Sequence, residues 1–412
     1  NATEPNLRKN WVMALNDQSV KGRAFLVVLD SVGIGGAPDA DQYFNGDLPD
    51  TGSNTFGHIA QACADGLAEE GRSGPLNIPN LATLGIFHAE ALANGRAFDG
   101  APATGTWGAA EEVSRGKDTP SGHWELAGLP VPWDWHYFPD ETPAFPDQVT
   151  RAICEIANVD GILSNSHASG TGVIDEFGAA HMQTGQPICY TSIDSVLQIA
   201  AHEETFGLER LLDLCERLAP MVHAMKLGRV IARPFMGEPG NFERTPHRCD
   251  YAITPPAPVL SNWFQDAGRH VYAIGKIGDI FSMQGFNEVR KGTDAQLMQH
   301  LDDLVSDAVE GSLTFANFVE FDSQYGHRRD VSGYARHLEW FDSEIGGMIA
   351  RLGPDDIMVF TADHGNDPTW IGTNHTRERV PVIIAGGKAK ELGHIGFVDV
   401  AAIVSAHLGI SA

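Results

Sequence analysis

Three apolar runs, each followed by an aspartate, restrict the fold of this chain more than any other feature of its sequence. The runs are FLVVL before Asp30, NFVEF before Asp322 and MVFTA before Asp363. Near-continuous apolarity is typical of strands that are covered on both faces, as in a parallel sheet between helices. In open sheets of this kind, ligands bind at the carboxyl ends of the strands. The runs therefore predict an α/β fold with three carboxylates along its ligand-binding edge.

Other segments extend this pattern and suggest more than one domain. Residues 272–276 and 380–387 are expected to form strands, and residues 334–353 a helix, because its apolar residues recur at helical spacing. From residue 133 to 258 the alternation of strand and helix is lost, which indicates an inserted domain in a chain of 412 residues. The predicted division is a polar N-terminal extension over 1–22, a first core segment over 23–132, an inserted cap over 133–258 and a second core segment over 259–412.

The charge and the cysteines restrict the partners and the compartment. The chain has 54 acidic and 28 basic residues, a formal net charge of −26, which disfavours nucleic acid and anionic membranes as partners. No apolar run approaches the roughly 20 residues that a membrane span needs. The five cysteines are odd in number and have no CxxC spacing, so a reduced, cytoplasmic location is expected. An anionic substrate would need a local basic pocket.

Three histidines accompany two of these aspartates. His327 follows Asp322 after four residues, His364 directly follows Asp363, and His375 comes eleven residues after His364. A single strand-end aspartate is usually a turn residue, and a single histidine is usually structural. Together, however, three carboxylates and three imidazoles are enough ligands for two divalent ions of the Mn²⁺ or Zn²⁺ type. The absence of cysteine and the presence of three carboxylates favour a harder metal than a cysteine-rich site would bind.

The segment GKDTPSGHWELAG contains two hydroxyls that could act as nucleophiles, those of Thr119 and Ser121. An alcohol is a weak nucleophile at neutral pH unless a base or a metal ion activates it. The same residues also predict a capped helix N-terminus, which on local grounds is the commoner explanation. The residues alone indicate a hydroxyl nucleophile in this segment but do not choose between the two.

The segment GRVIARPFMGEPGNFERTPHRCDY contains four arginines in a chain that is otherwise poor in basic residues: Arg229, Arg233, Arg244 and Arg248. The planar guanidinium group is well suited to phosphate oxygens. Each arginine alone is more often a surface residue, but the group predicts a local anion site. Lys276, at the end of a predicted strand, is a weaker candidate.

With their neighbours, these motifs resemble the phosphopentomutase family of the alkaline phosphatase superfamily. The matching segments include FLVVLDSVGIGGAPDAD, GKDTPSGHWELAG, GRVIARPFMGEPGNFERTPHRCDYA, NFVEFDSQYGHRRDVSGYA and TADHGNDPTWIGTNHTRE, and they run from about residue 23 to near the C-terminus. The resemblance implies an alkaline-phosphatase-like core, with a mostly parallel sheet between helices, and an inserted smaller α+β cap.

The resemblance also implies roles for individual residues. It makes Thr119, not Ser121, the nucleophile, carried as a phosphothreonine. One metal ion is expected on Asp322, His327 and His375. The other, with Thr119 beside it, is expected on Asp30, Asp363 and His364. The substrate-binding residues it implies are Ser192, Asp194, Arg233, Arg248 and Lys276.

The activity implied by the resemblance is an isomerase reaction. It interconverts α-D-ribose 1-phosphate and D-ribose 5-phosphate, and their 2-deoxy counterparts, through a 1,5-bisphosphate. Two Mn²⁺ ions, a sugar bisphosphate activator such as glucose 1,6-bisphosphate, small sugar phosphates as the partners and a monomeric chain are expected. The alternatives are a cofactor-independent phosphoglycerate mutase or a metal-dependent phosphatase of the same superfamily. Two positions depart from the family pattern, because Asn374 stands in place of an aspartate and Cys249 in place of a frequent histidine.

Overall fold

The computed structural model describes residues 21–168, 170–192 and 194–411, which form two compact units. The first unit takes in the described residues of Asn1–Glu111, Leu260–Ile277 and Gly285–Ala412, and the second takes in those of Glu112–Val259 and Gly278–Gln284. Residues 133–258 lie within the second unit, which also includes residues 112–132 and 278–284. The four-segment division drawn from the sequence stays a prediction, and residues 1–20 of the expected extension lie outside the described residues.

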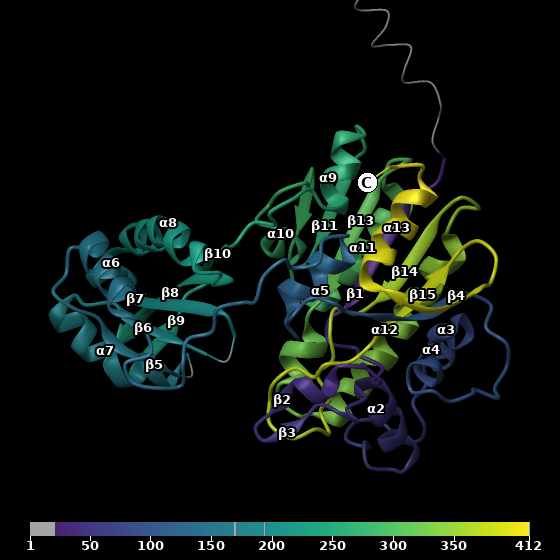
Figure 1. Ribbon diagram of the computed structural model, residues 1–412, viewed down its shortest axis with the longest axis horizontal. Coiled ribbons are helices and arrows are strands. Elements are labelled where there is room, and N and C mark those ends of the chain that lie inside the picture. Colours follow the sequence, from purple (N-terminus) through teal and green to yellow (C-terminus); the bar gives the residue numbers. More distant parts are fainter. Residues whose placement is uncertain (1–20, 169, 193, 412) are drawn as a thin grey trace, which may run out of the picture. The chain divides into compact units, whose positions relative to one another are not determined.

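An eight-stranded sheet forms the centre of the first unit (Figure 1). Its strands in spatial order are β12 (Glu288–Arg290), β11 (Val271–Ile274), β13 (Leu313–Phe318), β1 (Ala24–Leu29), β14 (Ile357–Thr361), β15 (Val380–Ala385), β4 (Thr106–Glu111) and β16 (Glu391–Gly396). Neighbouring strands are parallel except where β15 pairs with β14 and with β4. Every residue of β1, β13 and β14 is buried, so the predicted α/β fold is confirmed.

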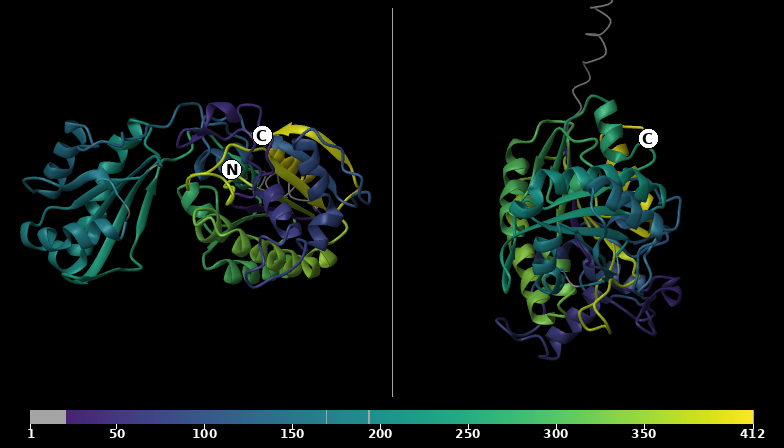
Figure 2. Two further views of the ribbon diagram at one scale, coloured as in Figure 1. Left: turned by 90° about the horizontal axis from the view of Figure 1, so that it is seen from below. Right: turned by 90° about the vertical axis from the view of Figure 1, so that its left-hand side faces the viewer.

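Helices cover this sheet. They are α2 (Thr55–Ala64), α3 (Pro79–Leu84), α4 (Ile86–Ala93), α9 (Leu260–Asp266), α11 (Asp294–Asp307), α12 (Val331–Arg351) and α13 (Phe397–His407). The helix expected over 334–353 is therefore α12, which begins earlier because the Asp330 carboxylate accepts the backbone N–H of Gly333. Figure 2 shows the yellow C-terminal strands beside the blue helices α3 and α4, which contact β15. Among the described helices, none has the length and apolarity that a membrane span requires.

The strand expected over 317–321 ends earlier than the apolar run suggests. β13 stops at Phe318, and residues Phe321–Gly326 form a short helical turn, η3, which contains Asp322. The cause is Asp294, whose carboxylate accepts the backbone N–H groups of Val319 and Glu320 at 3.2 and 3.1 Å. These donors are therefore satisfied by a side chain rather than by a neighbouring strand. Asp322 follows β13 through this turn and does not sit at the strand end.

The second unit is built on a smaller, mixed sheet (Figure 1). Its strands are β10 (Cys249–Ala252), β8 (Arg229–Glu238), β7 (Val196–His202), β6 (Ile188–Thr191) and β5 (Leu163–His167) in spatial order, with β9 (Asn241–Arg244) paired to β8. Its helices include α5 (Thr119–Leu126), α6 (Asp147–Ala157), α7 (Gly172–Thr184) and α8 (Leu208–Ala224). Strand and helix alternate here only in part, because β6 and β7, and then β8, β9 and β10, follow each other without an α-helix between them. The sequence pattern that marks these strands is weak. β5 has the sequence LSNSH and no fully buried residue, and β6 has only four residues.

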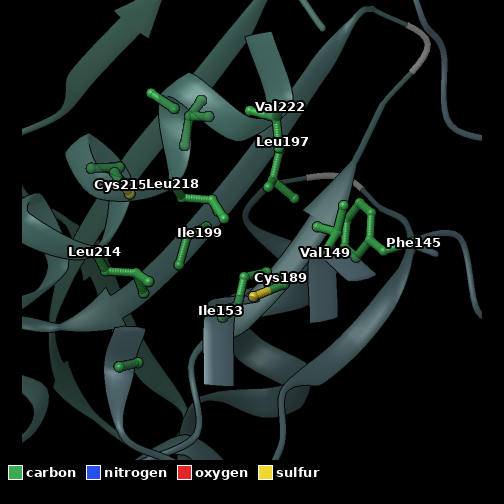
Figure 3. Close-up of a cluster of buried hydrophobic side chains, with 14 of the residues drawn as sticks. Phe145, Val149, Ile153, Cys189, Leu197, Ile199, Leu214, Cys215, Leu218 and Val222 are labelled. Atoms are coloured by element: carbon green, nitrogen blue, oxygen red, sulfur yellow. The ribbon is translucent and has the colours of Figure 1, made fainter. Parts of the chain in front are cut away.

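Apolar side chains on both faces of this sheet form the core of the second unit. On one face, Cys189, Leu197 and Ile199 pack against residues of α6 and α8, as Figure 3 shows. On the other face, Tyr190 and Phe235 pack against residues of α7. Cys189 and Tyr190 are neighbours in the chain, and successive strand residues point to opposite faces. The second unit therefore has its own core, as a separately packed body requires.

Candidate functional site

Two groups of aspartates and histidines, all buried except the partly exposed His327, meet near the ends of β1, β13 and β14. In the first group, the ligand atoms of Asp30, Asp363 and His364 lie within 4.8 Å of one another. His364 Nε2 lies 3.5 Å from Asp30 Oδ1 and 3.3 Å from Asp363 Oδ2. Ser31 donates its backbone N–H to Asp363, and Asn317 donates its amide to Asp30. These two donors orient the carboxylates without using all of their oxygens.

One carboxylate oxygen of the first group shows how well the group suits a cation. Within the described chain, Asp30 Oδ1 is buried and has no hydrogen-bond partner. An unsatisfied buried carboxylate oxygen is costly in free energy, and such an oxygen is a natural metal ligand. The donors are oxygen and imidazole nitrogen without a thiolate, which fits a divalent ion of the Mn²⁺ or Zn²⁺ type.

The second group contains Asp322, His327 and His375. His327 Nε2 lies 3.1 Å from Asp322 Oδ2 and 3.2 Å from His375 Nε2, and His375 Nε2 lies 3.4 Å from Asp322 Oδ1. His327 Nδ1 donates to the carbonyl of Thr373 at 2.7 Å, so its Nε2 is left as the ligating nitrogen. The rings of His364 and His375 stack with their centroids 3.9 Å apart, which joins the two groups.

The electrostatics of the cluster also favour bound cations. Burial, followed by the charges of Asp363 and Asp322, raises the pKa of Asp30 well above its usual value. Burial lowers the pKa of His364 to about 4, so this imidazole is neutral at pH 7, which is the form that binds metal. Burial would raise the pKa of Asp322, but the charges and hydrogen bonds of His375 and His327 together outweigh burial and hold this pKa well below its usual range. A cation would stabilise the charged form of all three carboxylates.

Sequence reasoning missed the amide side chains that orient these ligands. Asn317 binds Asp30 Oδ2 at 2.9 Å, and Asn366 donates to Asp322 Oδ1 at 2.7 Å. Asn317 could have been found as a polar residue inside an apolar run. Nothing in the sequence marked Asn366 in this way. It lies two residues after His364 but donates its hydrogen bond to Asp322, which is 44 residues away in the chain.

Thr119 and Ser121 have different surroundings at the start of α5. Asp118 caps the helix by accepting the backbone N–H of Ser121 at 3.0 Å, so the cap predicted from the sequence is confirmed. Ser121 is fully buried, and its hydroxyl accepts Trp135 Nε1 at 2.7 Å and donates to Asp118 at 3.2 Å. Thr119 is partly exposed at the first position of the helix, where a phosphate is stabilised. The surroundings favour Thr119 as the nucleophile.

The predicted arginine group lies on β8, on β9 and just before β10. Arg248 forms a two-point ion pair with Asp250, with both N–O distances at 2.6 Å, and Arg229 lies 3.6 Å from the same carboxylate. Arg233 instead donates to the neutral side chain of Gln198 at 3.1 Å. Burial, followed by the charge of Arg248, lowers the pKa of Arg233 to about 10. An anion beside Arg233 would relieve this cost, as expected at a phosphate-binding residue.

The other predicted substrate residues come from other parts of the chain. Ser192 follows β6 and Asp194 precedes β7, and in the described chain no hydrogen bond or ion pair joins their side chains to Arg233 or Arg248. Lys276 follows β11 in the first unit, and its charge acts to lower the pKa of Asp30. The structure thus associates Lys276 with the metal cluster, and the roles of all these residues in substrate binding stay predictions.

Comparisons with known proteins identify the family. A model of the metalloenzyme superfamily matches residues 22–412. The phosphopentomutase of Sinorhizobium fredii is 53% identical over 405 residues, which cover 94% of this chain and 97% of that protein. The phosphopentomutase of Chelativorans sp. is 53% identical over 400 residues, covering 95% and 96%. Among solved structures, the PH0037 protein from Pyrococcus horikoshii aligns at 14% identity with a TM-score of 0.48, covering 95% of this chain and 99% of that one. The resemblance drawn from the motifs is confirmed, and the chain belongs to the phosphopentomutase family of the metalloenzyme superfamily.

Proposed function

We propose that this chain interconverts α-D-ribose 1-phosphate and D-ribose 5-phosphate, and the corresponding 2-deoxyribose phosphates, with Thr119 as the phosphoryl carrier. The observation that carries the proposal is the joined cluster of six buried or half-buried ligand residues in a chain that is 53% identical to phosphopentomutases. The same relatives, at nearly full length, favour the mutase over a phosphoglycerate mutase or a phosphatase of the superfamily.

Two divalent cations, Mn²⁺ in each case, are assigned to the cluster. Asp30, Asp363 and His364 would hold one ion, and Asp322, His327 and His375 would hold the other. When bound, such ions neutralise the oxygens of a transferring phosphoryl group and lower the pKa of a hydroxyl. The neutral state of His364 and the oriented Nε2 of His327 support this assignment.

The proposed reaction has two balanced transfers. In the first, the bond between Thr119 Oγ1 and phosphorus breaks while a bond forms from phosphorus to the acceptor hydroxyl of the sugar monophosphate. The hydroxyl proton ends on Thr119, and the product is a 1,5-bisphosphate. In the second, the bond between the other phosphorus and its sugar oxygen breaks while a bond forms from that phosphorus to Thr119 Oγ1. The Thr119 proton ends on the sugar oxygen, and the isomeric monophosphate is left. A sugar bisphosphate such as glucose 1,6-bisphosphate would prime the unphosphorylated enzyme by the same transfer.

Arginines and other polar residues are assigned to the sugar phosphate. Arg233 and Arg248 would bind a phosphate, because guanidinium groups donate two parallel hydrogen bonds to its oxygens. Ser192 and Asp194 would contact the sugar, and Lys276 would contact an anionic group. The proposal also includes that the chain is a monomer, that its partners are small molecules and that it is located in the cytoplasm. The five free cysteines support a reducing compartment.

The decisive experiment locates the phosphate. After incubation with Mn²⁺ and glucose 1,6-bisphosphate, intact mass should rise by one phosphoryl group, and peptide mapping should place that group on Thr119. Thr119→Ala should lose both the phosphate and mutase activity while it still binds metal, and Thr119→Ser should keep some of both. Phosphate on Ser121, or mutase activity in Thr119→Ala, would refute the assignment. Turnover of 3-phosphoglycerate in place of ribose 5-phosphate would refute the substrate.

A further inference from the structure

Arg329 lies two residues after His327, and its side chain makes an unusual set of hydrogen bonds. Its Nε donates to the carbonyl of Gly372 at 2.6 Å, and its Nη2 donates to the carbonyl of Asn374 at 3.0 Å. Its Nη1 donates to the carbonyl of Gly326 at 2.8 Å and also to the side-chain oxygen of Asn366. One guanidinium group thus joins the turn before His327 to Asn366 and to the loop at Gly372 and Asn374, which lie 37 to 45 residues further along the chain.

Each of these segments carries or orients one ligand of the second group. Gly326 directly precedes His327, and Asn374 directly precedes His375. The third ligand is reached through an amide, because Asn366 accepts from Arg329 and donates its own N–H to Asp322 Oδ1 at 2.7 Å.

The contact with Gly372 completes this arrangement. Thr373 lies between the two carbonyls that accept from Arg329, and its own carbonyl accepts Nδ1 of His327. The guanidinium group therefore fixes the backbone that sets the ring orientation of His327, as outer residues of metal sites commonly do.

Other residues hold the ligands of the first group in place. Its carboxylates accept from the backbone of Ser31 and the side chain of Asn317, and His364 Nδ1 faces the carbonyl of Gly365 at 3.1 Å. None of the hydrogen bonds that Arg329 makes within the described chain reaches these residues. The stacked rings of His364 and His375 connect the two groups, whereas the described hydrogen bonds of Arg329 are made only around the second group.

The backbone of Arg329 adds a second observation. Its φ of +55° lies in the left-handed region, which a residue with a side chain adopts at a cost in free energy. The Arg329 side chain offers a compensating gain, since all of its described bonds go to acceptors in the loops around the second group. Lysine would keep the charge, but it has neither the planar fork nor the five N–H donors.

We propose that Arg329 is a positioning residue that pre-organises Asp322, His327 and His375 for one cation, while the cation on Asp30, Asp363 and His364 does not depend on it. The inference rests on the proposed two-metal function. It adds that different residues hold the ligands of the two metal sites in place, so that a substitution can weaken metal binding at one site and leave it unchanged at the other.

The test compares Arg329→Lys with Arg328→Lys, the same substitution at the exposed neighbouring position. Mn²⁺ is titrated into each metal-free full-length protein, and free Mn²⁺ is followed by electron paramagnetic resonance. The wild type and Arg328→Lys should bind two ions. Arg329→Lys should bind one ion with unchanged affinity and the other about 10- to 100-fold more weakly. Mutase activity of Arg329→Lys should return as Mn²⁺ is raised, which damage to the fold would not allow.

The outcomes separate this inference from the proposed function. If the wild type binds fewer than two ions, the two-metal function fails, and the inference fails with it. If the wild type binds two ions and Arg329→Lys binds both unchanged, or loses affinity for both equally, only the inference fails. If Arg329→Lys does not fold, Asn366→Ala tests the branch that reaches Asp322, because it removes the amide that accepts from Arg329 and donates to Asp322. This variant should weaken the same single ion, and unchanged affinity for both ions would contradict the inference.

Discussion

At the scale of single residues, the two departures from the family pattern, Asn374 and Cys249, lie outside the set of predicted ligands. Asn374 Oδ1 accepts the backbone N–H of His375 at 2.9 Å, a bond that an aspartate oxygen could accept equally well. The loop is held further by Asn45, which accepts the backbone N–H of Asn374 at 3.0 Å. Cys249 packs against the apolar core of the second unit, where a small, weakly polar side chain suits its neighbours. Neither departure therefore removes a predicted ligand.

Glu378 supports a prediction on pH at the same scale. It is fully buried, accepts from the backbone and hydroxyl of Thr55 and from the hydroxyl of Thr376, and has a pKa raised from 4.5 to about 7 by burial and next by Asp367. The folded protein thus binds this proton more tightly than the unfolded chain does. Its contribution to stability is present below about pH 4.5 and is lost as pH rises through about 7.

Glu378→Gln should remove this dependence, because glutamine has no proton to lose. Relative to the variant, the metal-free wild type should lose up to about 3 kcal/mol of unfolding free energy between about pH 4.5 and pH 8. Urea denaturation of both proteins in chelator, at several pH values, measures the difference. A constant difference across this range would mean that Glu378 has an ordinary pKa.

At the scale of elements, Asp294 connects the end of β13 to two helices. It begins α11, accepts the backbone N–H groups of Val319 and Glu320, and lies 2.9 Å from Nε2 of His337 on α12.

Asp294→Ala should lower the unfolding free energy by about 3 kcal/mol, since it leaves buried donors unsatisfied. Asp307→Ala, at the exposed end of the same helix, should change it by less than about 0.5 kcal/mol. Equal midpoints in urea for the two variants would show that Asp294 does not stabilise this junction.

The same elements show what could be predicted from the sequence. β1 was predictable residue by residue because all of its residues are apolar and buried. The end of β13 was not, because Phe321 continues the apolar run while Asp294, from another helix, takes the donors that a longer strand would use. The proximity of the candidate ligands was predictable because they follow strands in short motifs. The contacts of Arg329 were not, since they depend on how loops over 40 residues apart in sequence fold against each other.

At the scale of the whole molecule, the two units should respond separately to metal and to core mutation. All six predicted ligands belong to the first unit, whereas Leu218 is fully buried in the core of the second. A ligand that binds only the folded state stabilises it by about 2.7 kcal/mol at 100 times its dissociation constant. Mn²⁺ should therefore slow amide hydrogen exchange in β1, β13 and β14 and leave β7 and β8 unchanged.

Leu218→Ala should have the complementary effect. Removing a buried leucine side chain costs about 2–5 kcal/mol, and here the loss falls on the packing of α8 against β7 and β8. Exchange should accelerate in these elements while β1 and β14 keep the protection of the wild type and both Mn²⁺ ions still bind. Mass spectrometry of exchanged peptides resolves the units in a single experiment. If either change altered exchange uniformly along the chain, the two units would unfold as one cooperative body, and metal binding would stabilise the second unit as much as the first.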